Sequence, residues 1–216
     1  MDNIVPYLHT HQAYALNGKE VPSVTTILGI ISKPYLMKWA NNLGLRGKSL
    51  ADENKHTFGI GTLLHAKIEG FLKNTEVDTF GYTPTQRTIA EACFKKFLKW
   101  WESQEKITAI YIEKSFVSKR GYGGTVDAFL EINGLPTIVD WKTSKAISSD
   151  YYIQLSAYIQ LLEDNGEEPK QVAILRTPKD DSIAEYVVFD AKEVKEAYFK
   201  VFESAMRLYN DLSNIR

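Results

Sequence analysis

The spacing of apolar residues changes near the middle of the chain. Before Ile107 the apolar side chains recur every three or four residues, which is the period of amphipathic helices. From Ile107 onward, short runs rich in β-branched and aromatic residues alternate with further helical stretches. This order predicts an α/β protein in which a mixed sheet lies between helices and a helical segment precedes it.

Cap and turn residues set the boundaries of the expected elements. The predicted helices are residues 24–31, 34–43, 48–56, 62–72, 84–103, 150–164 and 191–212. The predicted strands are residues 107–117, 125–132, 137–141, 171–177 and 185–189, after an N-terminal hairpin over residues 11–21. Gly59 and Gly61 are expected to separate two helices. We expect a hairpin and helical extension over residues 1–57 and a core over residues 58–216.

Composition narrows the class of protein. The 216 residues suit one domain with a sizeable core. No run reaches the ~18 apolar residues that cross a bilayer, and the first residues lack the pattern of a secretion signal. We therefore expect a soluble intracellular protein, in the cytoplasm of a bacterium or of a phage-infected cell, with no membrane partner. The single cysteine, Cys93, excludes a disulfide framework and a cysteine-ligated iron–sulfur cluster.

Charge is unevenly distributed although the net charge is only −1. Residues 33–73 carry seven basic and three acidic side chains, a balance of +4. Residues 163–216 carry twelve acidic and eight basic side chains, a balance of −4. A basic half facing an acidic half would orient a polyanion such as DNA, and scattered solvated charge is the alternative.

Two aspartates are predicted to face each other across a hairpin. If Asn133-Gly134 is a two-residue turn, Asp127 falls opposite Asp140 at a position where the strands approach closely. Like charges placed directly opposite destabilise a sheet, and a shared Mg²⁺ or Mn²⁺ ion would offset that repulsion. Lys142 lies on the same face as Asp140 and could hold a scissile phosphate, stabilise the transition state or orient the attacking water. A solvated Asp–Lys pair is the alternative, and Pro136 could shift the register through a bulge.

Two helical pairs add candidate ligands. His65 and Glu69 are four residues apart, hence on one helix face, where His65 could bind a metal and Glu69 a second ion or a water. Gln154 and Tyr158 share the same spacing and could hydrogen-bond a phosphate or the lysine. Surface attraction for the first pair and helix packing for the second are the alternatives. Contacts to the DNA backbone are a further possible role, for which the candidates are Thr125, Thr143 and Ser144.

These pieces occur in an order that resembles the PD-(D/E)XK nuclease superfamily, in its RecB-like branch. The matching segments are Gly61-Thr-Leu-Leu-His65 with Glu69, Gly124-Thr-Val-Asp127, Asp140-Trp-Lys142 and Gln154-Leu-Ser-Ala-Tyr158. The front end, with Val21-Pro-Ser-Val-Thr25 and Trp39, is similar to phage exonucleases and to the mitochondrial genome maintenance exonuclease of that branch.

The resemblance implies a restriction-endonuclease-like three-layer sandwich with a central mixed sheet. It implies that His65, Asp127, Asp140 and the main-chain carbonyl of Trp141 bind Mg²⁺ or Mn²⁺. It also implies that Lys142 is catalytic beside Asp127 and Asp140. The implied supporting or DNA-contacting residues are Gln154, Tyr158 and Glu113.

The expected activity is hydrolysis of phosphodiester bonds in DNA, by an exonuclease that acts on single strands or frayed ends. A structure-specific endonuclease or resolvase, and a non-catalytic DNA-binding module of a recombination or replication complex, are the alternatives. The sequence contains no helicase phosphate loop, so a helicase or another replication or recombination protein would have to supply unwinding.

Overall fold

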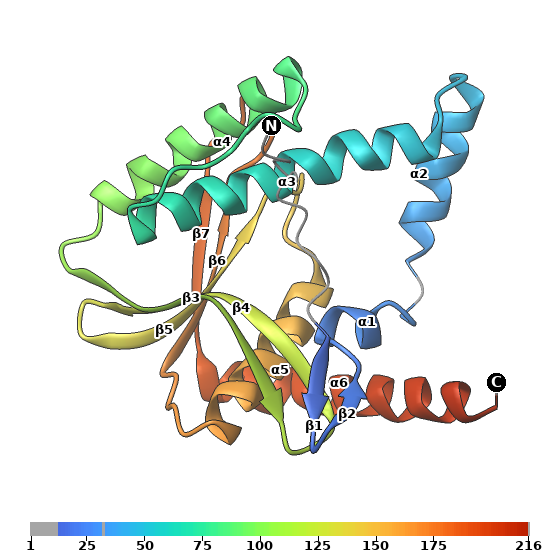
Figure 1. Cartoon of the computed structure of the whole chain (residues 1–216), viewed down its shortest axis with the longest axis vertical. Coiled ribbons are helices and arrows are strands. Elements are labelled where there is room, and N and C mark those ends of the chain that lie inside the picture. Colours follow the sequence, from blue (N-terminus) through green and yellow to red (C-terminus); the bar gives the residue numbers. More distant parts are fainter. Residues whose placement is uncertain (1–12, 32, 216) are drawn as a thin grey trace, which may run out of the picture.

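A computed structural model describes residues 13–31 and 33–215 of the protein. A central sheet lies between two layers of helices, and an arm of helices extends from one side (Figure 1). The elements in chain order are β1 (Tyr14–Leu16), β2 (Lys19–Val21), α1 (Val24–Leu28), α2 (Pro34–Leu45), α3 (Leu50–Lys73), α4 (Pro84–Glu102), β3 (Ile107–Ser118), β4 (Tyr122–Ile132), β5 (Leu135–Lys142), α5 (Ser149–Asp164), β6 (Gln171–Arg176), β7 (Glu185–Asp190) and α6 (Ala191–Asn214).

The central sheet has five strands in the order β3-β4-β5-β6-β7. All neighbours are antiparallel except β5 and β6, which are parallel and joined through α5. A parallel pair needs a long crossover, and a helix that packs on the sheet supplies it. The sheet is therefore mixed, as the sequence predicts.

Each face of the sheet is covered by helices that bury a separate core. Helices α1, α5 and α6 pack on one face around Val126, Phe129 and Phe202. Helices α3 and α4 bury the opposite face around Phe97 and Trp141. Side chains of β4 point into both cores, since successive side chains of a strand point to opposite faces, but this alternation is interrupted at Asp127, whose flanking residues Val126 and Ala128 lie in different cores. The predicted three-layer α/β sandwich is confirmed.

Two of the predicted helix boundaries are wrong. The two helices expected over residues 48–56 and 62–72 form one continuous helix, α3, although Gly59 and Gly61 lie inside it. A glycine costs a helix ~1 kcal/mol, and packing offsets that cost here. The amide of Gln86 donates to the carbonyls of Lys55 and His56 at 3.3 and 3.1 Å, and a Cβ at Gly59 would lie 2.2 Å from that amide nitrogen. Helix α1 also ends earlier than predicted, at Leu28.

The other boundaries agree closely with prediction. The Asn17-Gly18 turn has both residues at positive φ, 52° and 75°, as a primed hairpin turn requires, while residues 11 and 12 of the predicted hairpin lie outside the described residues. Helix α3 crosses residue 57, so the division into residues 1–57 and 58–216 stays a prediction. Among the described residues, no helix has both the length and the apolar content needed to cross a membrane.

Candidate active site

The hairpin of β4 and β5 has the predicted register. Its pairs run from Ile132 opposite Leu135 to Ala128 opposite Val139, and Asn133 and Gly134 form the turn at φ 52° and 83°. Pro136 causes no bulge. Counting from the turn, it occupies a non-hydrogen-bonded position of this ladder, where its missing N–H is not needed.

The ladder ends at the point where Asp127 and Asp140 would face each other. In a continued ladder, both polar main-chain groups of Trp141 would pair with the main chain of β4. The Trp141 N–H instead donates to the carboxylate Oδ2 of Asp127, at 2.9 Å. Strands β4 and β5 therefore separate here, and a side chain takes over a main-chain hydrogen bond.

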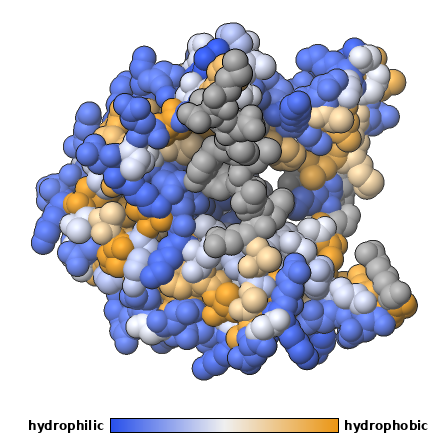
Figure 2. Space-filling view, in the orientation of Figure 1, coloured by the Kyte–Doolittle hydropathy of each residue, from blue (hydrophilic) through white to orange (hydrophobic). Residues whose placement is uncertain are grey.

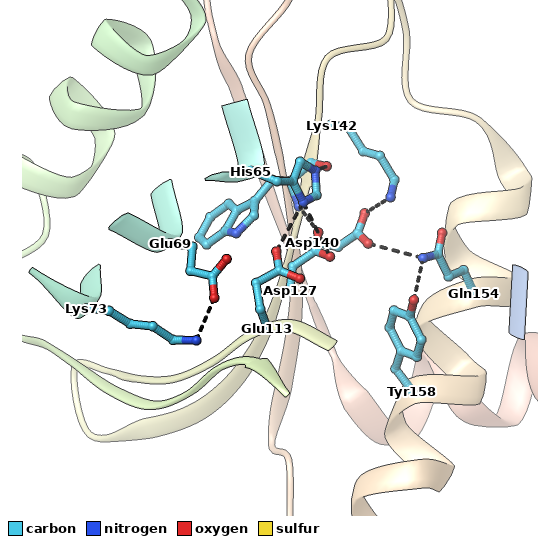
Figure 3. A network of polar contacts seen from close by, with 10 residues as sticks. His65, Glu69, Lys73, Glu113, Asp127, Asp140, Lys142, Gln154 and Tyr158 are labelled. Atoms are coloured by element: carbon cyan, nitrogen blue, oxygen red, sulfur yellow. Dashed lines mark hydrogen bonds and ion pairs between the residues drawn. The ribbon is translucent and has the colours of Figure 1, made fainter. Parts of the chain in front are cut away.

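His65 reaches this opening from α3, on the side of the sheet that α3 and α4 cover (Figure 3). Its Nε2 atom lies 3.1 Å from the Trp141 carbonyl oxygen. Its Nδ1 atom lies 3.3 Å from Glu113 Oε1 and 3.7 Å from Asp127 Oδ1. His65, Glu113 and Asp127 each offer a ligand atom, and these atoms all lie within 4.8 Å of one another.

Glu113 enters the cluster through an unusual backbone conformation. Its φ is 46°, in the left-handed region that a glutamate seldom adopts. In the β3–β4 ladder Ile112 and Lys114 have partners on β4, and Glu113 between them has no ladder partner. Counting along that register places Glu113 opposite Asp127. A left-handed non-glycine residue costs ~1–2 kcal/mol, and such strain is concentrated at functional sites.

Asp140 and Lys142 form the other half of the cluster. Lys142 Nζ lies 2.5 Å from Asp140 Oδ2, and the two side chains are 17% and 1% exposed. The Gln154 amide approaches Asp140 Oδ1 at 3.4 Å and donates to the Tyr158 hydroxyl at 2.8 Å (Figure 3). The predicted Gln154–Tyr158 pair thus lies beside the aspartate and supports it.

Burial and neighbouring charges shift the pKa values of four side chains in this cluster, which are Asp140, Asp127, His65 and Lys142. Burial raises the pKa of Asp140 to about 6, against the lowering effect of Lys142, and burial also raises the pKa of Asp127. Burial would lower the pKa of His65, but Asp127 and Glu113 outweigh it and raise that pKa to about 9. The pKa of Lys142 is likewise raised, because Asp140 and Asp127 outweigh burial. The cluster therefore holds more negative charge than its buried surroundings favour.

The remaining predicted residues lie near the cluster and take part in local contacts. Glu69 is one helical turn from His65 and forms an ion pair with Lys73 at 2.6 Å, so its carboxylate is outside the ligand cluster. Thr125 shares 2.8 Å hydrogen bonds with Tyr14 and with Ser115. The hydroxyl of Thr143 lies 3.6 Å from the place of a Cβ on Gly61, and the Ser144 hydroxyl donates to the Ala146 carbonyl at 2.8 Å.

Sequence reasoning missed one residue that shapes this region. Arg176, 9% exposed, is held by Glu185 at 2.9 Å and donates to the carbonyls of Ser144 and Lys145 at 3.4 and 3.3 Å. It thereby fixes the loop that follows Lys142. The sequence signal for Arg176 is a basic residue at the end of a buried strand. The loop carbonyls that it contacts could not be inferred, because they are distant in the sequence.

The donor set fits a hard divalent cation. It offers carboxylate oxygens, a main-chain carbonyl and one imidazole nitrogen, which are ligands that Mg²⁺ and Mn²⁺ accept. Adjacent ligands of an octahedral ion with bonds of ~2.1 Å lie ~3 Å apart. The 3.3 Å between His65 Nδ1 and Glu113 Oε1 is close to that spacing, and the Trp141 oxygen lies 3.1 Å from the other ring nitrogen. Asp140 is not part of the tightest ligand group among the described residues, and its two oxygens lie near Lys142 Nζ and the Gln154 amide.

The strands thus separate at a buried cluster of Asp127, Asp140 and Lys142, to which helix α3 contributes His65. The family model of the PD-(D/E)XK nuclease superfamily matches residues 34–214. The chain therefore belongs to the PD-(D/E)XK nuclease superfamily, whose members are nucleases that act on DNA with divalent metals.

Comparisons with curated proteins and with solved structures do not define the function further. None of the curated proteins matches the chain. A solved crystal structure, that of SSO0001, is 12% identical over 59% of this chain and 62% of its own. The chain thus spans less than two thirds of that protein, and a TM-score of 0.28 is too low to define a shared architecture.

Proposed function

We propose that the protein is a Mg²⁺- or Mn²⁺-dependent deoxyribonuclease that removes nucleotides from the ends of single-stranded or frayed DNA. One observation carries the proposal. His65, Asp127 and the Trp141 carbonyl converge where β4 and β5 separate, with the Asp140–Lys142 pair on the adjoining strand end. Buried like charges of this kind are costly in a fold unless a cation or a reaction needs them.

The proposed metal ligands are His65, Asp127, Asp140 and the Trp141 carbonyl, and the geometry adds Glu113. A cation bound there would neutralise charge on the scissile phosphate and lower the pKa of a bound water. The hydrogen bond from the Trp141 N–H fixes one oxygen of Asp127 and leaves the other directed at His65. Asp127 is thereby held in one orientation before any ligand arrives.

Lys142 is proposed as the electrostatic catalyst. Its ammonium group is favoured by Asp140 at 2.5 Å, so it supplies positive charge where negative charge develops on the phosphate. During hydrolysis the attacking water loses a proton as its oxygen bonds to phosphorus, the bond to the leaving oxygen breaks, and the leaving oxygen gains a proton from the solvent. Gln154 and Tyr158 hold Asp140 in place from the other side.

The preference for single-stranded ends rests on two features. Residues 33–73, which form α2 and α3, have a balance of +4, and α2 with the start of α3 extends as an arm beside the sheet (Figure 1). The front-end motif is also similar to exonucleases of the RecB-like branch. A positively charged arm beside the cluster suits a flexible strand that follows the arm toward the cluster.

The test uses labelled linear and circular single-stranded DNA with Mg²⁺ or Mn²⁺. An exonuclease degrades the linear strand and leaves the circle intact, whereas cleavage of the circle supports a structure-specific endonuclease or resolvase. Asp140→Ala and Lys142→Ala should lower the cleavage rate at least ~100-fold, and Lys106→Ala, 73% exposed just before β3, is the control. Full activity of Asp140→Ala would refute the proposed mechanism. Strand binding without cleavage in the wild type would indicate a non-catalytic module.

A further inference from the structure

A cavity of about 330 Å³ lies between α2, the start of α3 and the loop after β5. Its lining includes Trp39, Leu43, Arg46, Lys48, Glu53 and Lys145, and we call it the Trp39 pocket. Arg46 and Lys48 belong to the turn between α2 and α3, and the outline of the molecule is notched between α2 and α6 (Figure 2). A volume near the ~300 Å³ lower bound of small-ligand sites admits a single small molecule or one monomer of a polymer.

The lining combines a flat aromatic group with positive charge. Trp39 is half-buried, and Arg46, Lys48 and Lys145 outnumber the one acid, Glu53. Lys48 lies 3.9 Å from Glu53. Over residues 13–31 and 33–215, no carboxylate lies within 4.0 Å of the charged groups of Arg46 or Lys145, so both are available to an anion. A planar guanidinium binds phosphate oxygens in pairs, and an indole face stacks on a nucleobase.

The pocket is connected to the candidate active site through the loop that follows Lys142. Lys145 follows Lys142 by three residues, and Arg176 fixes the loop between them through the Ser144 and Lys145 carbonyls. On the other side, Lys33 just before α2 is bound to Asp150 at the start of α5 at 2.5 Å. Lys145 is thus linked to β6 through Arg176, and the start of α2 is linked to α5 through Lys33.

We infer that the Trp39 pocket holds one unpaired nucleotide of the DNA substrate, with its base on the Trp39 indole and its phosphate among Arg46, Lys48 and Lys145. This inference rests on the proposed function and assigns it a single-strand specificity determinant. A base stacked inside a duplex does not expose the face that Trp39 would cover. The pocket therefore selects DNA that is already unpaired.

The test is equilibrium binding of the full chain, in EDTA to prevent cleavage, to a labelled short single strand and to a blunt hairpin duplex. Trp39→Ala should weaken single-strand binding ~10-fold or more, because a stacked base contributes ~1–3 kcal/mol. Duplex binding should be unchanged, and Trp39→Phe should retain most of the affinity. Arg46→Gln should reduce the salt dependence of single-strand binding by about one phosphate contact. Lys200→Gln, exposed on α6, is the charge-matched control.

Three outcomes would refute the proposed role of the Trp39 pocket. The first is that Trp39→Ala binds the single strand as tightly as the wild type. The second is that Trp39→Ala loses affinity for the single strand and for the duplex equally. The third is that Trp39→Phe binds as weakly as Trp39→Ala although its thermal midpoint equals that of the wild type. Failure of the proposed function looks different, since the wild type then cleaves no DNA with Mg²⁺ or Mn²⁺ while the binding results in EDTA still decide the role of Trp39.

Discussion

The Asp127 carboxylate accepts a hydrogen bond from the main-chain N–H of Trp141 at 2.9 Å, where the main-chain ladder between β4 and β5 has just ended. This contact links two proposed roles of Asp127. One oxygen maintains the separation of the strands, and the other lies 3.7 Å from His65. Substitutions can therefore separate the structural role of the side chain from its charge.

Asp127→Asn and Asp127→Ala should differ in stability but not in activity. Asparagine can still accept from the Trp141 N–H and removes a buried negative charge, so metal-free stability should be unchanged or higher. Alanine leaves that buried N–H without its acceptor and should cost ~1–3 kcal/mol. Both should lose at least ~100-fold in cleavage rate, because the charge is absent. Urea unfolding in EDTA and rates on a linear strand measure the two effects, and equal stability of the two variants would contradict the structural role.

Divalent cations should stabilise the folded protein. At a concentration of about ten times the dissociation constant, Mn²⁺ should contribute ~1.4 kcal/mol, or a rise of roughly 3–6 °C in the thermal midpoint. Asp140→Asn and His65→Gln should show a smaller rise than the wild type, while Glu69→Gln should keep it, because Glu69 forms its ion pair with Lys73 outside the ligand group. Calorimetric or fluorescence melting with and without Mn²⁺ checks this, and an undiminished rise in His65→Gln would remove His65 from the ligand set.

Glu113→Gly should stabilise the metal-free protein and impair the site. Glycine adopts a φ of 46° without the ~1–2 kcal/mol that glutamate incurs, so unfolding in EDTA should cost about 1 kcal/mol more than in the wild type. Cleavage should fall, because a ligand atom is lost. The control is Glu131→Gly on β4, opposite Pro136, where an ordinary strand conformation predicts a loss of ~0.5–1 kcal/mol. If Glu113→Gly were less stable than the wild type, the contacts of the Glu113 carboxylate would stabilise the fold by more than its left-handed backbone destabilises it.

Lys142→Ala should lower the cleavage rate ~100- to 1,000-fold while the concentration of Mn²⁺ needed for half-maximal rate changes little, because the ammonium acts on the phosphate. Lys142→Arg should recover part of the rate, since it restores positive charge with a different shape. Metal titrations of the steady-state rate separate the two quantities. A large shift in metal requirement with an unchanged maximal rate would make Lys142 a support for the metal ligands instead.

Lys33→Met should raise the pKa of Asp150. Burial alone would raise that pKa, but hydrogen bonds from Lys33 and Ser148 hold it below the ordinary value of 3.8. A carboxyl with a lowered pKa adds stability that is fully present above pH 3.8 and is lost as the pH falls through its folded value. The stability gap between wild type and Lys33→Met should therefore be widest near neutrality and shrink in acid. NMR titration of the Asp150 carboxyl measures its pKa, and urea unfolding near neutral pH and in acid measures the stability gap. A gap that does not change with pH would contradict the ion pair.

The local sequence determined much of the sheet. Alternating apolar positions and the turn residues Asn133 and Gly134 fix the register of β4 and β5, because a one-residue slip would turn every buried side chain outward. Continued by one pair, that register predicts that Asp127 and Asp140 lie near each other, with Lys142 on the same face of β5 as Asp140. The order of the motifs, added to this register, indicates the superfamily before any coordinates are considered.

Only the tertiary structure decided the rest, since it depends on contacts between residues far apart in the chain. The continuity of α3 follows from the packing of Gln86 against Gly59, which outweighs local helix propensity. The left-handed conformation of Glu113 and the fixing of the 144–145 loop by Arg176 arise where separate elements meet. Hydrophobic spacing records which face of an element is buried, but not which distant side chain lies against it.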